Sequence, residues 1–307
     1  MSPVVVVEDL GKRFGDFEAV RGVSFEVQPG EIFGYLGANG AGKSTTIRIL
    51  CGLMTPTSGK AVVAGHDVAK HATAVRFSVG YMSQKFSLYP ELSAMENLDF
   101  FGGAYRVPRK KRLERARKLL AEVDLTDAAH TPVRALPGGL RQRLALVTAL
   151  LHEPRIVFLD EPTAGVDPDA RRTFWQLIRR VAASGTAVFV TTHYMDEAEY
   201  CARVGLMAAG RLVALDTPAE LKRTRVPGRM YEVRGQGLTA APLQSMGGAL
   251  EVVPFGAGYH VRAEQDVGAE AVARAATAAG AADVHVEETE PSLEDVFVAV
   301  AREGGAA

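Results

Sequence analysis

Short apolar runs alternate with stretches of helical spacing along most of the chain. Short β-type runs predict strands at residues 4–10 and 18–27, and apolar runs predict strands at residues 31–37, 155–160 and 186–193. Further strands are expected at residues 60–68 and 77–84. Apolar positions at helical spacing predict helices at residues 44–53, 109–125 and 168–184, within a mainly helical region over about residues 88–153. Because strands and helices alternate, we expect an α/β fold with a parallel sheet covered on both faces.

The pattern changes after Leu221, where the stretch RTRVPGR (residues 223–229) is expected to be a linker. Residues 229–300 then predict strand, helix, two strands, helix, strand and a closing helix. This order indicates a small α+β domain of ferredoxin-like type. We therefore expect one domain over residues 1–222 and a second over residues 229–307.

Composition narrows the class of protein. The 307 residues carry a net charge of −1, which argues against nucleic acid as a partner. The two cysteines, Cys51 and Cys201, form no disulfide framework or zinc-binding pattern. The N-terminal apolar run has no basic leader and is interpreted as a strand, and no apolar run is long enough for a membrane span. The basic residues at 109–118 are interpreted as a solvated helix face, with a patch for lipid headgroups or nucleic acid as the alternative.

A glycine-rich loop follows the expected strand at residues 31–37 and opens the next helix. The stretch GANGAGKST matches the phosphate-binding pattern G-x₄-G-K-[ST]. Its glycines let backbone N–H groups turn toward a phosphate, Lys43 reaches the β- and γ-phosphates, and Ser44 offers a hydroxyl to Mg²⁺. The predicted nucleotide-binding residues of this loop are Gly37, Asn39, Gly40, Ala41, Gly42, Lys43, Ser44 and Thr45.

Two acidic residues close the apolar run IVFLDE. Asp160 stands at the expected end of the strand, where a carboxylate can hold the Mg²⁺ shell. Glu161 comes next and can orient and deprotonate an attacking water. Together with the phosphate loop, this pair predicts a nucleoside triphosphatase.

A second anion-binding pattern is present in the stretch LPGGLRQR at residues 136–143. Its two glycines precede an expected helix start, which directs backbone N–H groups and a positive helix end toward an anion. One nucleotide site does not require two such loops in one chain.

These motifs, in this order, resemble the nucleotide-binding subunit of an ATP-binding cassette (ABC) transporter over roughly residues 4–220. The resemblance implies a P-loop NTPase cassette with a RecA-like parallel core, an antiparallel β subdomain and an α-helical subdomain, binding ATP and Mg²⁺. It further implies that Phe14 stacks on adenine and that Gln84 senses Mg²⁺ and the attacking water. His193 is implied to contact the γ-phosphate, and Asp167 belongs to the loop that crosses the dimer interface.

The same resemblance explains the second glycine loop. LPGGLRQR lies where the family carries its LSGGQ signature, so Gly138 and Gly139 would contact ATP held by the phosphate loop of a second subunit. Pro137 departs from the family because it has neither a hydroxyl nor an N–H, and Leu140 lacks the family's glutamine amide. We expect a working ATPase with a weakened clamp. A degenerate-site subunit of a heterodimer and a non-hydrolysing regulatory subunit are the alternatives.

The C-terminal stretch EPSLEDVFVAV at residues 290–300 resembles ATPases of the daunorubicin-resistance type. This resemblance implies an ABC-2 type exporter for drugs, lipids or natural products, with a separate integral-membrane permease. The C-terminal domain is then implied to regulate the enzyme or to hold a dimer. The expected location is peripheral, on the cytoplasmic face of the membrane. A soluble ABC ATPase that acts on the ribosome or DNA is the alternative.

Overall fold

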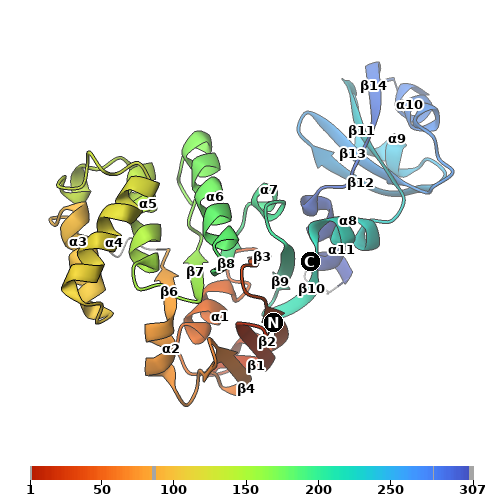
Figure 1. The fold of residues 1–307 in the computed structure, drawn as a ribbon. Coiled ribbons are helices and arrows are strands. Elements are labelled where there is room, and N and C mark those ends of the chain that lie inside the picture. Colours follow the sequence, from red (N-terminus) through yellow and green to blue (C-terminus); the bar gives the residue numbers. More distant parts are fainter. Residues whose placement is uncertain (1, 85–87, 279, 304–307) are drawn as a thin grey trace. The chain divides into compact units, whose positions relative to one another are not determined.

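The structure is a computed structural model that describes residues 2–84, 88–278 and 280–303 (Figure 1). The chain divides into two compact units, the first ending at Pro218 and the second spanning Ala219–Glu303. Residues 304–307, which the sequence assigns to the C-terminal domain, lie outside the described residues.

A six-stranded sheet forms the centre of the first unit. In spatial order its strands are β10 (Arg211–Asp216), β9 (Arg203–Ala208), β3 (Ile32–Gly37), β8 (Ala187–Thr192), β7 (Ile156–Asp160) and β6 (Val79–Met82). All neighbouring strands are parallel except β10, which pairs with β9 in the antiparallel direction. Every residue of β3, β7 and β8 is buried, because both faces of a parallel sheet are covered. The expected parallel core is confirmed.

A four-stranded antiparallel sheet packs on this core. Its strands, in spatial order, are β2 (Phe17–Val27), β1 (Val5–Phe14), β4 (Ser58–Val63) and β5 (His66–Asp67). Phe25 of β2 contacts rings of the central sheet, with its centroid 5.2 Å from that of Phe33 and 5.8 Å from that of Phe189. These contacts join the two sheets in one hydrophobic core.

Helices of the first unit cover the central sheet and form a separate helical region. They are α1 (Lys43–Leu50), α2 (Ala72–Ser78), α3 (Ala94–Ala104), α4 (Arg109–Glu122), the 3₁₀ turn η1 (Val133–Ala135), α5 (Gly138–Leu150), α6 (Pro168–Ala183) and α7 (Met195–Ala198). Helix α3 begins with a capping box in which Ser93 and Glu96 satisfy each other's backbone N–H groups. The expected strand at residues 77–84 was too long: Phe77 and Ser78 end α2, where the Ser78 hydroxyl donates to Ala74 O.

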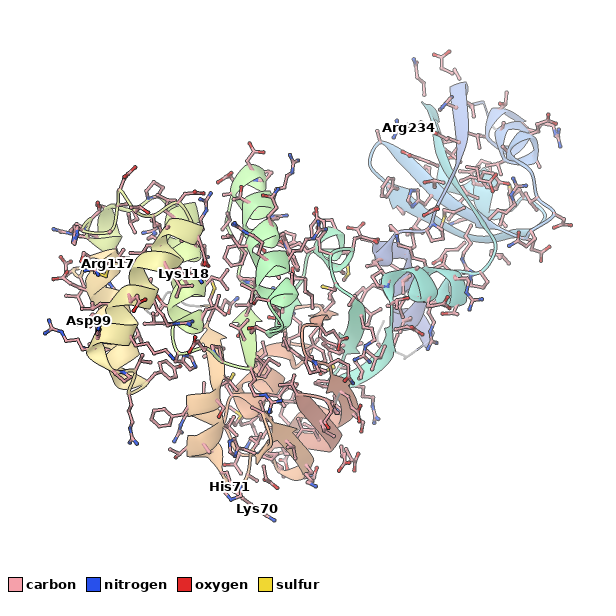
Figure 2. All side chains as sticks on the ribbon, viewed as in Figure 1. Lys70, His71, Asp99, Arg117, Lys118 and Arg234 are labelled. Atoms are coloured by element: carbon pink, nitrogen blue, oxygen red, sulfur yellow. The ribbon has the colours of Figure 1, made fainter. Side chains whose placement is uncertain are left out.

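The basic stretch at 109–118 lies on α4, and Arg117 and Lys118 are exposed on its surface (Figure 2). Several of its members have acidic partners. Lys111 and Arg115 pair with Glu153, and Arg112 pairs with Asp99 at 2.5 Å. The structure therefore supports the interpretation of a solvated face with local charge neutralisation.

The second unit has the order β11, α9, β12, β13, α10, β14, α11, preceded by α8. Its elements are α8 (Pro218–Arg225), β11 (Arg229–Gln236), α9 (Ala240–Gln244), β12 (Ala249–Phe255), β13 (Gly258–Ala263), α10 (Ala269–Ala278), β14 (Ala282–Thr289) and α11 (Leu293–Glu303). The antiparallel sheet order β12-β13-β11-β14 is that of a ferredoxin-like fold, as expected. The linker prediction was wrong for residues 223–225, which end α8, where Arg223 pairs with Glu220 one turn earlier.

Among the described residues, no helix combines the length and the apolar composition needed to cross a bilayer.

His152 joins the helical region to the central sheet. Its ring stacks on Tyr105 at the end of α3, with centroids 3.7 Å apart, and its Nε2 lies 3.0 Å from Val79 O at the start of β6. Because a carbonyl oxygen only accepts, Nε2 carries the proton and donates. Burial lowers the pKa of His152 from 6.5 to about 4, so the ring is neutral in the folded protein at pH 7.

Acidification is expected to destabilise the cassette through His152. Between pH 6.5 and about 4 the unfolded chain binds a proton at this ring and the folded chain does not. The free energy of unfolding therefore falls by up to about 1.4 kcal/mol per pH unit from this group. Urea unfolding followed by fluorescence of the single tryptophan, Trp175 of α6, measures this change. His152→Gln keeps an N–H donor without titrating and should show a shallower dependence; equal slopes would contradict the prediction.

Candidate functional site

The glycine-rich loop connects β3 to α1 and lies at the carboxyl end of the parallel sheet. Gly42 has φ +105°, and a Cβ there would lie 2.4 Å from Ala19 O, so no side chain fits. Gly40 has φ +84°, and a Cβ there would meet nothing within 4 Å. The loop is thus closed on its inner side and open on the side of Gly40, which fits a cradle for a phosphate. Ala41 N donates to Ala38 O at 3.1 Å within this turn.

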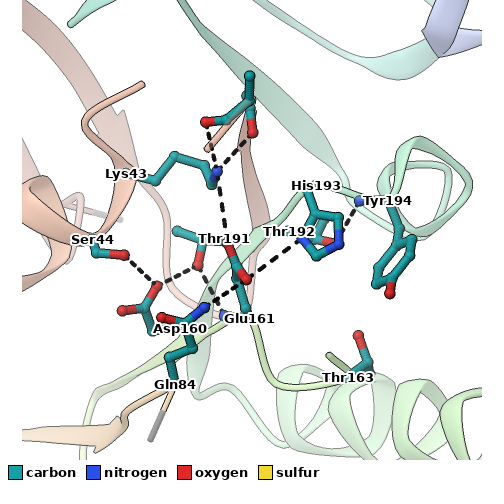
Figure 3. A network of polar contacts seen from close by, with 12 residues as sticks. Lys43, Ser44, Gln84, Asp160, Glu161, Thr163, Thr191, Thr192, His193 and Tyr194 are labelled. Atoms are coloured by element: carbon teal, nitrogen blue, oxygen red, sulfur yellow. Dashed lines mark hydrogen bonds and ion pairs between the residues drawn. The ribbon is translucent and has the colours of Figure 1, made fainter. Parts of the chain in front are cut away.

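Lys43 is buried at the first position of α1, and its ammonium group faces both the loop and an acidic residue (Figure 3). Nζ donates to Gly37 O at 2.6 Å and to Ala38 O at 3.1 Å, and lies 3.7 Å from Glu161 Oε1. Burial lowers the pKa of Lys43, while the Glu161 and Asp160 carboxylates act in the opposite direction. The loop and the acidic pair therefore share one buried cation.

Asp160, the last residue of β7, receives two hydroxyl hydrogen bonds at one oxygen. Ser44 Oγ donates to Asp160 Oδ1 at 3.1 Å and Thr191 Oγ1 donates at 2.8 Å. Burial raises the pKa of Asp160, and these two hydrogen bonds oppose the rise. The carboxylate and the Ser44 hydroxyl are hard oxygen ligands of the kind Mg²⁺ prefers. Mg²⁺ usually takes one or two protein carboxylates and keeps several waters, so further ligands would come from substrate phosphates and water.

Glu161 follows Asp160 in a left-handed conformation with φ +49°. Its backbone N–H donates hydrogen bonds to two oxygens of Thr191, the backbone oxygen at 3.2 Å and Oγ1 at 3.0 Å. Gln84 Nε2 donates to Glu161 Oε2 at 2.9 Å, and His193 Nδ1 lies 3.5 Å from the same oxygen (Figure 3). One carboxylate thus faces an amide, an imidazole and the Lys43 ammonium.

The second glycine loop forms another part of the candidate site. Helix α5 begins at Gly138, with Pro137 in the N-cap position at φ −54° and ψ 153°. A cavity of about 450 Å³ is lined by Pro137, Gly138, Gly139, Arg141, Gln142 and residues 164–167. A Cβ at Gly138 would meet nothing within 4 Å, so the loop faces open space. Asp167 caps α6 by accepting from Ala170 N at 2.9 Å, which holds its loop in place.

Phe14, Asn39 and Thr45 are the remaining predicted site residues. Phe14 ends β1 and is 47% exposed, and Lys12 Nζ lies 5.2 Å from its ring centroid. An exposed ring of this kind offers a face for stacking. Asn39 lies in the glycine-rich turn and Thr45 in the first turn of α1.

Thr191 is the residue that sequence reasoning missed. Its hydroxyl joins Asp160 to the Glu161 backbone, and no motif assigned it a role. The sequence did contain a sign of this role, because the stretch TAVFVTTH has threonines in an otherwise apolar run. The strand is fully buried, and a buried hydroxyl needs a hydrogen-bond partner.

Thr191→Val is expected to lower the free energy of unfolding by about 1–3 kcal/mol, since it removes the hydroxyl but keeps the shape. Urea unfolding followed by Trp175 fluorescence measures the loss. Thr191→Ser serves as the control because it retains the hydroxyl, and it should be less destabilising. A Val variant as stable as the unmutated protein would show that this hydroxyl contributes nothing.

A parallel sheet with a phosphate loop after β3 and an acidic pair after β7 defines the chain as a P-loop nucleotide-binding protein. Residues 20–164 match the ABC transporter family, and residues 217–301 match the family of ATP-binding protein DrrA1-3-like C-terminal domains.

Curated relatives agree with these matches. A probable multidrug ABC transporter ATP-binding protein, YbhF of Escherichia coli, is 49% identical over 71% of this chain, although the match spans only 38% of that relative. The daunorubicin resistance ATP-binding protein DrrA3 of Streptomyces coeruleorubidus is 41% identical over 71% of this chain and 69% of its own length. The Nod factor export ATP-binding protein I of Ralstonia nicotianae is 39% identical over 78% of this chain and 75% of its own length.

Solved structures show the same cassette. The ATP-binding cassette MJ0796, in a dimeric post-hydrolysis state bound to ADP and Pi, superposes with a TM-score of 0.63 at 27% identity, covering 69% of this chain and 98% of that one. The cbiO1 protein of Clostridium perfringens, part of the ABC transporter complex cbiONQ, gives a TM-score of 0.67 at 27% identity, covering 72% and 91%. The chain belongs to the ATP-binding proteins of ABC transporters, a family of ATP hydrolases.

Proposed function

We propose that this chain binds ATP with Mg²⁺ and hydrolyses it to drive an ABC-2 type membrane exporter. The observation that carries the proposal is the cluster of Lys43, Ser44, Gln84, Asp160, Glu161 and His193. These six side chains come from four separate segments and converge on one small volume at the carboxyl end of the parallel sheet (Figure 3).

Each member of the cluster has a distinct role in the proposal. The loop amides and Lys43 bind the β- and γ-phosphates, and Phe14 stacks on the adenine. Ser44 and Asp160 would hold Mg²⁺, whose charge stabilises the phosphate oxygens during transfer. Glu161 orients and deprotonates the attacking water. Gln84 and His193 contact the same Glu161 oxygen, so they position the base and approach the γ-phosphate.

The second glycine loop serves the nucleotide of a neighbouring subunit in this proposal. Gly138 and Gly139 open onto a cavity together with residues 164–167, and a second cassette can present its ATP there. The dimeric state of the MJ0796 cassette supports this arrangement. We propose a homodimer, with a heterodimer containing a second ABC ATPase as the alternative.

A membrane permease is proposed to dock beside Gln84, at the cytoplasmic face of the membrane. An aromatic cluster follows Gln84 along the chain: the ring of exposed Tyr89 lies 4.8 Å from that of exposed Phe100 and 6.0 Å from that of half-buried Phe101. Phe100 is 49% exposed. An exposed aromatic group of this kind is typical of an interaction surface.

Export of a drug, lipid or natural product is the proposed use of this ATPase. The relatives named for multidrug transport, daunorubicin resistance and Nod factor export support that direction, as does the DrrA1-3-like C-terminal domain. These relatives favour a transporter subunit over a soluble ATPase acting on the ribosome or DNA. The test is ATP turnover by the purified chain, alone and with its permease, against the Glu161→Gln variant.

A further inference from the structure

A buried carboxylate lies behind the catalytic cluster, in a position that the roles proposed above leave unused. Glu197 belongs to the short helix α7, four residues after His193, and is completely buried. Thr163 Oγ1 donates to Glu197 Oε1 at 2.5 Å, a length typical of a hydroxyl bound to a carboxylate. Arg171 Nε lies 3.5 Å from the same oxygen. A buried charge is costly unless it is paired, so this arrangement calls for an explanation.

The two partners of Glu197 stand at the two ends of one loop. Thr163 precedes residues 164–167, which line the cavity shared with the second glycine loop. Arg171 follows them in the first turn of α6, where its N–H donates to Asp167 O at 2.9 Å. One carboxylate oxygen therefore contacts both ends of the loop, through a hydrogen bond from Thr163 and an ion pair with Arg171. A second turn contact, from Val166 N to Thr163 O at 3.2 Å, closes the loop on itself.

The same cluster reaches the candidate γ-phosphate contact. The Arg171 guanidinium lies 4.1 Å from the ring centroid of Tyr194, at cation–π distance. The Tyr194 ring in turn lies 4.1 Å from the His193 ring, beside the catalytic cluster (Figure 3). Tyr194 N donates to Thr192 Oγ1 at 3.0 Å, which fixes the backbone next to His193.

We infer that Glu197, with Thr163 and Arg171, is a positioning group that couples the loop at residues 164–167 to His193. A shift of that loop moves Thr163 and Arg171 together, because both are held by one carboxylate. Arg171 then carries the shift to Tyr194 and His193. In the proposed dimer the loop faces the neighbouring nucleotide, so this carboxylate links the state of one site to the γ-phosphate contact of the other. The kinetic consequence rests on the proposed function; the mechanical coupling within the chain does not.

The first test is amide hydrogen exchange of the nucleotide-free protein, which needs no activity. Thr163→Val removes the hydroxyl with little change of shape and should speed exchange in residues 164–167 and in residues 193–198 together. Thr163→Ser keeps the hydroxyl and should leave both segments close to the unmutated protein. Arg171→Met is a second variant, in case Thr163→Val does not fold; it removes the contacts of Arg171 with Glu197, Asp196 and the Tyr194 ring. Faster exchange confined to residues 164–167 in these variants would overturn the coupling.

A control variant separates coupling from general loss of stability. Glu31→Gln breaks another Glu–Arg pair, in which Arg203 Nε lies 2.7 Å from Glu31 Oε1, just before the amino end of β3. It should leave the exchange of residues 164–167 and 193–198 unchanged. If Glu31→Gln raises exchange in those segments as much as Thr163→Val does, the effect is one of stability alone and the inference is wrong.

Steady-state kinetics supply the second test. Thr163→Val should lower kcat roughly tenfold or more while ATP binding to the isolated chain stays within about twofold, because the phosphate loop is untouched. Thr163→Ser should restore turnover. Unchanged kcat in Thr163→Val overturns the positioning role. Failure of the proposed function gives a different result: the unmutated chain and Glu161→Gln then have the same rate, and the exchange experiment still decides the inference.

Discussion

Glu161→Gln is expected to reduce ATP turnover by roughly 10²–10⁴-fold, the usual contribution of a positioned general base. The amide keeps the size of the side chain and can still accept from Gln84 Nε2, but it cannot take a proton from water. ATP binding should persist, because the loop amides and Lys43 remain in place. Turnover is measured as phosphate release by the purified chain, and binding by titration with a fluorescent ATP analogue.

Glu31→Gln is the matched control for this substitution. It makes the same chemical change at a carboxylate paired with Arg203, before the amino end of β3. Its turnover should stay close to that of the unmutated chain. If Glu161→Gln and the unmutated chain release phosphate at the same rate, the base assignment fails and the non-hydrolysing regulatory alternative is favoured.

The central sheet could be predicted because its signal is local. The stretches at β3, β7 and β8 are short continuous apolar runs, and each run is bounded by turn residues or by charge. The glycine-rich loop and the acidic pair stand directly at the ends of two of these runs. Parallel strands that end at one edge of a sheet bring such loops together, so their meeting follows from the fold class.

Contacts between distant segments could not be predicted in the same way. Gln84 and Glu161 are far apart in sequence, and only the resemblance to a family suggested that they meet. The role of Thr191 depends on a hydrogen bond from its hydroxyl to Asp160 on the neighbouring strand β7. Spacing along the sequence does not reveal this contact. Glu197 is a charged residue in a polar stretch, MDEAE, yet it is fully buried, with one carboxylate oxygen hydrogen-bonded by Thr163 and paired with Arg171. Burial of a paired charge is a property of tertiary packing.

The predicted ends of helices and strands were wrong where local sequence preference and contacts in the folded chain favour different structures. Phe77 and Ser78 have strand-like composition, but they complete α2, whose Val75 is buried against the core. Arg223 to Arg225 look like a charged linker, yet the Glu220–Arg223 pair supports one more helical turn before Pro227. Both errors concern helix ends, where side-chain contacts decide the last turn.

Pro137→Ser is expected to raise ATP turnover by roughly tenfold, with an upper bound near 150-fold. The new hydroxyl stands at the N-cap of α5, next to Gly138 and Gly139, where it can donate to the γ-phosphate of a neighbouring subunit. One hydrogen bond to a charged group contributes about 1.5–3 kcal/mol, which sets that range. Phosphate release by the purified chain, alone and with its permease, measures the change.

Pro137→Ala separates the hydroxyl from the loss of the proline ring. Alanine removes the ring constraint without adding a donor, so its turnover should match that of the unmutated chain. An equal gain in the Ala and Ser variants would mean that the ring, and not the missing hydroxyl, restrains this loop. Turnover that appears only in Pro137→Ser would show that Gly138 and Gly139 do not suffice as backbone donors. The native signature would then be a degenerate site, and its partner a second ATPase subunit with a complete one.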